Sequence, residues 1–127
     1  MPVSDPTADA LLERGLALLA AGAAAEAAKA FRSAIAMEPK HAKAHYGLVR
    51  ALRDAGKLEQ SIGAALALTV LTPHEPLAHA ALAASLRAAG HIPEAETAAA
   101  RARVLEWKLE LQSEPADGEA AGPGAKP

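Results

Sequence analysis

Five histidines are the residues of this chain with the clearest capacity for chemistry, because imidazole binds metal ions and transfers protons near neutral pH. His41 and His45 lie four residues apart. His74 and Glu75 lie close to His79. A metal site needs three or four converging ligands, and neither group has the spacing of a zinc-binding motif. We therefore predict that the histidines serve packing and loop structure, and we expect no metal, no cofactor and no catalytic residue.

The other reactive residue types give no catalytic signature either. The chain has no cysteine, so disulfides and cysteine zinc sites are impossible. Its glycines are isolated rather than gathered in a phosphate loop, and its serines lie in no nucleophile motif. Thirteen basic and fifteen acidic residues give a formal net charge of −2, which attracts neither nucleic acid nor anionic lipid. We predict a protein that is not an enzyme and that binds neither nucleic acid nor a membrane.

The elements that position these residues must be helices. Alanine accounts for 36 of the 127 residues and leucine for 17, whereas Phe, Tyr and Trp occur once each. This composition favours helix and excludes β-sandwiches and barrels. The apolar run from Leu16 to Ala25 follows acidic residues and contains Gly22, so we interpret it as part of a buried helix pair rather than a secretory signal. The absence of cysteine fits a cytoplasmic protein, and the Ala-, Gly-, Pro- and Arg-rich bias suggests a bacterial one.

An internal repeat organises the chain. Gly22, Gly56 and Gly90 are separated by 34 residues each, and so are Pro39 and Pro73. The residues before each glycine repeat one phrase, seen in 18–22, 52–56 and 86–90. Apolar residues recur at three- and four-residue steps on both sides of each glycine, which predicts two amphipathic helices per unit. Each glycine is expected to end the first helix as a left-handed cap.

Prolines and small residues fix the expected ends and contacts of these helices. Pro39 and Pro73 are expected to end the second helices of the first two units, whereas Pro6, Pro76 and Pro93 suit first turns, with Asp5 as an N-cap. In the second helices, Ala27 and Ala95 allow a close approach to the first helices. Phe31 fills the gap in the first unit, where the equivalent Ala65 and Ala99 leave less bulk, so we expect the first unit to be the best packed.

This pattern resembles the tetratricopeptide repeat family. The first unit matches the family motif at Leu11, Gly15, Leu18, Gly22, Ala27, Phe31, Ala34 and Pro39. The second departs from it with Val49, Ser61 and Ala65, and the third has Trp107 in place of the closing proline. The resemblance implies an all-α, right-handed superhelical solenoid of three antiparallel helix pairs. Its expected parts are a lead at 1–7, repeats at 8–41, 42–75 and 76–112 (the last with an extended helix), and a disordered tail at 113–127.

The resemblance also implies a binding surface, because in that family the first helix of each pair lines a concave groove that commonly holds a peptide or helix. The expected groove residues form an apolar floor, a basic stripe and small positions that leave room for a ligand: Leu12, Leu16, Leu19, Lys43, Tyr46, Arg50, Arg53, Ala80, Ala84 and Arg87. Gly47 and Leu77 fall on the same faces. We predict a protein ligand with apolar anchors flanked by carboxylates.

Such a groove predicts a non-catalytic interaction module that acts as an adaptor or scaffold. A small dedicated chaperone for one secretion or pilus subunit is the alternative, because such chaperones are similar in size and repeat number. The family's Lys/Asn clamp for a C-terminal carboxylate is not recognisable, since Leu12 and Leu16 occupy its positions in the first unit.

The C-terminal end leaves two questions open. Without a closing proline the last helix should run past Trp107, carrying a stripe of Val104, Trp107 and Leu111. This stripe either caps the third unit or forms an exposed apolar strip for weak self-association or a partner. The tail residues Glu114 and Asp117, with Glu119, offer a further alternative in which the tail folds back on the basic stripe.

Overall fold

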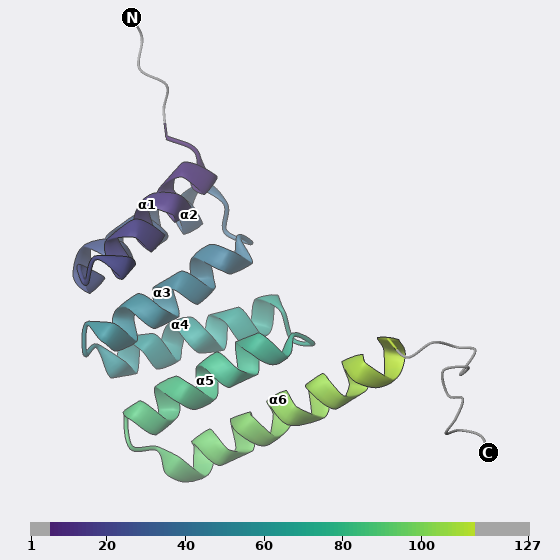
Figure 1. The fold of residues 1–127 in the computed structure, drawn as a ribbon. Helices are drawn as coiled ribbons and strands as arrows, with labels where there is room; N and C mark the ends of the chain where they lie inside the picture. The colour runs from purple at the N-terminus through teal and green to yellow at the C-terminus, as the bar shows by residue number, and fades with distance from the viewer. Residues whose placement is uncertain (1–5, 114–127) are drawn as a thin grey trace, which may run out of the picture.

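Helix-forming residues dominate the chain, and the regular secondary structure of residues 6–113 is accordingly all helical. The computed structural model describes residues 6–113. Its helices are α1 (Ala8–Ala20), α2 (Ala24–Met37), α3 (Ala42–Asp54), α4 (Leu58–Leu71), α5 (Pro76–Ala88) and α6 (Ile92–Ser113). They form three antiparallel pairs stacked in a solenoid (Figure 1), as the 34-residue period predicts. The apolar run 16–25 forms the end of α1, a turn and the start of α2.

Each pair closes through the same tight turn. Gly22, Gly56 and Gly90 have backbone φ angles of +85°, +77° and +87°, a conformation that residues with a Cβ atom rarely adopt. In all three turns the amide after the glycine donates to the carbonyl five residues earlier: Ala23 to Leu18, Lys57 to Leu52 and His91 to Leu86. The predicted glycine caps are therefore confirmed.

The starts of the first helices differ from one repeat to the next. Thr7 caps α1, because its hydroxyl oxygen accepts a hydrogen bond from the Ala10 amide at 3.0 Å. The expectation that Asp5 caps this helix is wrong, since Thr7 occupies the N-cap position and Asp5 itself lies outside the described residues. Pro76 stands in the first turn of α5, as predicted, and needs no amide partner there.

Two histidines tie the linker between repeats to the helix that follows it. The His45 Nε2–H donates to the Pro39 carbonyl at 2.8 Å, and the His79 Nε2–H donates to the Pro73 carbonyl at 2.9 Å. The two bonds are equivalent, 34 residues apart. Packing and loop structure, the roles predicted from the sequence, therefore account for both side chains.

The first junction between repeats is built around one aromatic ring. Phe31, on α2, is fully buried between α1 and α3. A Cβ atom added to Gly15 or Gly47 would lie 2.6 Å or 2.5 Å from this ring, so both positions must be glycine for the ring to fit. Phe31 fills the gap in the first unit, as predicted. It also contacts Gly47 of the second unit, which the sequence reasoning placed only on the groove face.

The second junction has small residues and a buried chain of hydrogen bonds instead. Ala65 occupies the position equivalent to Phe31 and lies in a small apolar cluster with Val49 and Ala81. The Ser61 hydroxyl donates to the Val49 carbonyl at 2.9 Å, so the Ser85 hydroxyl donates to Ser61 at 2.6 Å. Both serines are fully buried, and together they join α3, α4 and α5.

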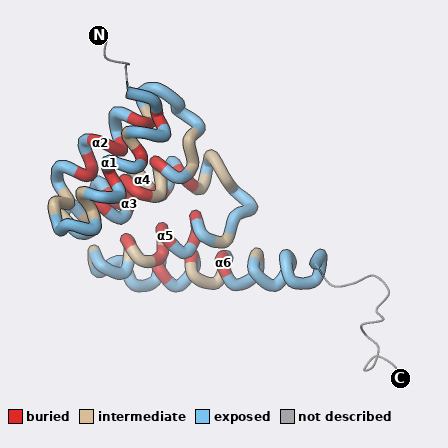
Figure 2. Tube along the Cα trace, turned by 45° about the horizontal axis from the view of Figure 1, so that its top comes forward, coloured by how far each residue is buried: buried red, intermediate tan, exposed pale blue. Residues whose placement is uncertain are grey.

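The last helix continues well past its partner. α6 has 22 residues and α5 has 13, so the predicted extension beyond Trp107 is confirmed and reaches Ser113. Figure 2 shows that the buried positions of α6 stop before this overhang. Val104, Trp107 and Leu111 are 48%, 60% and 51% exposed, so the stripe does not fold onto the third repeat. Within residues 6–113, no helix combines the length and apolar character that crossing a bilayer requires.

Candidate functional site

The first helices of the three repeats border an open pocket of about 490 Å³ on the concave side of the solenoid. Helices α1, α3 and α5 supply most of its wall, and α4 with the following turn supplies the rest. Its lining is mainly apolar: Leu12, Leu16, Ala42, Lys43, Tyr46, Gly47, Arg50, Leu68, Thr72, Glu75, Leu77 and Ala78. Most of these residues lie on helices that pack in pairs, so the fold itself positions them.

The pocket brings together half of the ten groove residues named from the sequence. Those that line it are Leu12, Leu16, Lys43, Tyr46 and Arg50. Those that do not are Leu19, Arg53, Ala80, Ala84 and Arg87. Leu19 is half-buried and packs against the core of the first junction, whereas Ala80 is exposed.

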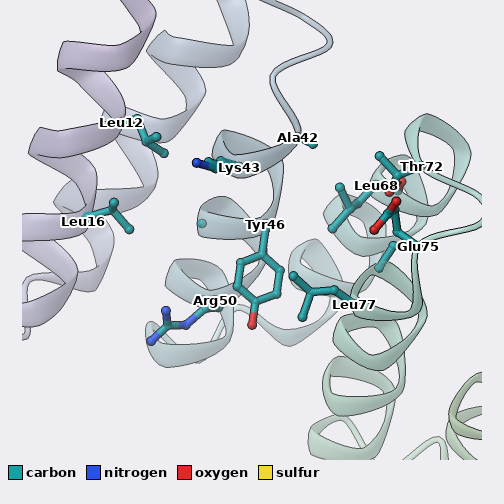
Figure 3. Close-up of a pocket in the computed structure, with 12 residues that line it drawn as sticks. Leu12, Leu16, Ala42, Lys43, Tyr46, Arg50, Leu68, Thr72, Glu75 and Leu77 are labelled. Atoms are coloured by element: carbon teal, nitrogen blue, oxygen red, sulfur yellow. Dashed lines mark hydrogen bonds between the residues drawn. The ribbon is translucent and has the colours of Figure 1, made fainter. Parts of the chain in front are cut away.

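Tyr46 divides the pocket. Figure 3 shows its ring between Leu12 and Leu16 of α1 on one side and Leu77 of α5 on the other. The ring is half-buried and also packs against the apolar cluster of the second junction. Leu16 and Leu77 are 39% and 54% exposed, so both offer apolar surface to a ligand. The site therefore has two apolar halves that share one aromatic wall.

Charged groups stand at the rim of the pocket without partners of their own. Lys43, Arg50 and Glu75 line it, are exposed, and form no ion pair with any residue in the described range 6–113. Lys43 also borders a neighbouring depression lined by Asp9, Glu13 and Glu38. Acidic side chains thus surround Lys43, whereas Arg50 lies two helical turns further along α3.

The two other arginines of the predicted basic stripe behave differently from Arg50. Arg87 forms an ion pair with Glu96 of α6 at 3.0 Å, which occupies its guanidinium. Arg53 follows Arg50 by three residues and is half-buried. One terminal nitrogen of Arg53 is buried and has no hydrogen-bond partner within the part of the chain that the structure describes. This nitrogen has almost no accessible surface and Arg53 does not line the pocket, so Arg50 is the arginine of this stripe that faces a ligand.

Sequence reasoning missed the residues that the second repeat contributes from outside its first helix. Leu68 and Thr72 at the end of α4 and Glu75 in the next turn line the pocket beside Leu77. The rule that first helices line the groove excludes them. The sequence does contain a signal for Glu75. It directly precedes the proline that starts α5, which places it at the end of the groove where the first helices begin.

A second apolar groove, of about 440 Å³, lies between α4 and α6 over one face of α5. Leu82 and Leu86 form part of its floor and remain half-buried. Their equivalents in the preceding repeat, Leu48 and Leu52, are 8% and 1% exposed. This groove therefore belongs to the second junction alone.

The histidines form no site with the acidic residues around them. His41 accepts from the Ala44 amide through Nδ1 at 3.3 Å and donates to Asp9 through Nε2 at 3.0 Å. Both ring nitrogens are thus engaged in capping α3 and in joining it to α1. Among residues 6–113, no three His, Asp or Glu side chains lie close enough together to hold a metal ion.

Comparison with protein families adds one match. The family model described as tetratricopeptide repeat matches residues 18–84. No curated protein sequence matches the chain significantly.

Several solved structures of other proteins share this fold. A crystal structure of MamA superposes with a TM-score of 0.76 at 23% identity, over 82% of this chain and 61% of MamA. The type III secretion translocator chaperone SycD from Yersinia enterocolitica gives 0.75 at 20% identity, over 95% of this chain and 88% of SycD. The second tetratricopeptide domain of Spaghetti (RPAP3), bound to the HSP90 peptide SRMEEVD, gives a TM-score of 0.73 at 18% identity. The match covers 78% of this chain and 92% of that domain. The TM-scores show a shared fold, and this chain spans about six-tenths of MamA.

Proposed function

The chain belongs to the tetratricopeptide repeat family, and we propose that it is a non-catalytic interaction module that holds a peptide or helix of a partner protein in its concave pocket, as an adaptor or scaffold. The pocket between α1, α3 and α5 carries this proposal, because it combines exposed leucines with unpaired charged groups at its rim. Its walls belong to packed helix pairs, so a ligand binds without ordering the protein.

The proposal is tested by selecting random twelve-residue peptides displayed on phage against the purified chain. We expect enrichment of peptides with apolar anchors, and loss of their binding in a Leu16→Ala/Leu77→Ala variant. These two leucines are exposed, so the variant keeps the core of the fold. An Arg103→Glu variant on the exposed side of α6 is the matched control and should bind as the wild type does. Failure to enrich any peptide, or equal binding by the leucine variant, would refute groove binding.

A dedicated chaperone for one secretion or pilus subunit is the second candidate. The observation that favours it is the agreement in extent with SycD, which this chain matches over nearly the full length of both. A chaperone of this kind forms a one-to-one complex with a partner that is poorly soluble alone, whereas a scaffold binds several stable partners. Co-expression with captured partners, followed by measurement of stoichiometry and of the solubility of each partner alone, distinguishes the two.

A further inference from the structure

The two ends of the pocket, taken along the axes of its helices, carry opposite charges. Glu75 lies in the turn before α5, at the same end of the groove as the first turn of α3. Asp9, Glu13 and Glu38 line the adjoining surface at this end, which is therefore acidic despite Lys43. Arg50 lies at the other end, about 10 Å further along α3 from Lys43 at 1.5 Å per residue.

Arg53 adds positive charge beyond this end of the pocket without lining it. It lies one turn beyond Arg50, and its buried terminal nitrogen has no hydrogen-bond partner among residues 6–113. A carboxylate held by Arg50 would bring acceptor oxygens to this end of the groove, where charge-assisted hydrogen bonds are strongest. The Glu75 carboxylate has no ion pair in the described chain and carries the opposite charge to Arg50. It favours a lysine or arginine of the ligand.

We infer that the pocket selects a partner segment with opposite charges on the two sides of its apolar anchors, an acidic residue toward Arg50 and a basic residue toward Glu75. This inference rests on the proposed function and differs from the sequence-based prediction of apolar anchors flanked by carboxylates. Leu12, Leu16 and Leu77 receive the anchors on the two sides of Tyr46 (Figure 3). An extended segment covers the distance of about 10 Å in three residues, at roughly 3.3 Å each.

The test repeats the phage selection on two charge-reversal variants, Arg50→Glu and Glu75→Lys. We expect wild-type peptides to carry both an acidic and a basic residue around the apolar anchors. Arg50→Glu should enrich peptides that have replaced the acidic residue with a basic one, and Glu75→Lys should enrich the reverse. Arg103→Glu, outside the pocket, should leave the selected charges unchanged. All three sites are exposed, so the variants should fold.

Affinities measured by fluorescence anisotropy quantify the effect. The best wild-type peptide should weaken about fivefold on either charge reversal and recover when its own matching charge is reversed. Binding that depends on Leu16 and Leu77 but shows no charge exchange would overturn this inference and leave groove binding intact. Binding that is independent of those leucines as well would overturn both.

Discussion

The two junctions between repeats use the same backbone geometry and different side-chain solutions. At the first, the Phe31 ring occupies the space left by Gly15 and Gly47, and a continuous apolar core extends across α1, α2 and α3. At the second, Ala65 replaces the ring and a serine hydrogen-bond chain crosses the interface. A repeat fold can therefore join its units either through side-chain volume or through close approach with polar bonding. The groove between α4 and α6 lies at this second junction.

Removal of the aromatic ring should have the largest effect on stability. Phe31→Ala leaves a cavity lined by two glycines that cannot fill it, so we expect a loss of about 3 to 5 kcal/mol in the free energy of unfolding. Urea unfolding followed by circular dichroism measures it. An unfolding midpoint equal to that of the wild type would show that the first junction does not depend on the ring.

Gly47→Ala supplies the control for this prediction, because its effect should depend on the ring. In the wild type the added Cβ atom collides with Phe31, whereas in the Phe31→Ala background it has space and improves helix propensity by about 1 kcal/mol relative to glycine. The substitution should therefore destabilise the first protein and stabilise the second. The same sign in both backgrounds would contradict the arrangement described for this junction.

Breaking the serine chain should have an intermediate effect at the second junction. Ser61→Ala removes the side-chain donor to the Val49 carbonyl and leaves the Ser85 hydroxyl buried without its acceptor, at a cost of about 1 to 3 kcal/mol. The Ser61→Ala/Ser85→Ala double variant should lose less than the sum of the two single losses, because no hydroxyl is then left unpaired. Additive losses in a double-mutant cycle would mean that the two hydroxyls act independently.

The smallest expected effect on stability concerns two histidine–carboxylate contacts, one at each junction. His41 contacts Asp9 across the first junction and His91 contacts Glu59 across the second, at 3.0 and 3.1 Å. The His41 side chain is 9% exposed and also caps α3, whereas that of His91 is 45% exposed. We expect His41→Ala to cost about 1 kcal/mol and His91→Ala less than about 0.5 kcal/mol. Thermal melts of both variants under identical conditions give the ranking, and equal losses would show that the cap contributes nothing.

The sequence predicts the fold well because its signals are periodic. The 34-residue spacing of Gly22, Gly56 and Gly90 is sufficient for the helix pairs and their turns. Contacts that cross from one repeat to the next are not periodic, so they were harder to predict. The helical register places Gly47 on the groove face, although its hydrogen atom is what allows Phe31 to reach α3. The family motif marks Ser61 only as a departure, although this residue joins three helices.

The sequence predicts the candidate site less completely than the fold. The reason is that long side chains can extend away from the face on which their Cα atoms lie. Helical registers give the direction of a Cβ atom and leave the position of a long side chain undetermined. Arg87 shares a register with Arg53, yet it extends to Glu96 on α6 instead of entering the groove. Glu75 enters the site from a turn, where no helical register applies.

The open groove over Leu82 and Leu86 has a consequence for how the solenoid deforms. A change in superhelical curvature at the first junction must displace a buried ring between two backbones, whereas at the second it meets unfilled space between α4 and α6. We therefore expect bending to concentrate between the second and third repeats. We expect the Leu77 side of the pocket to widen or narrow around a bound segment. The Leu16 side should keep its position. Induced fit in this protein should be one-sided.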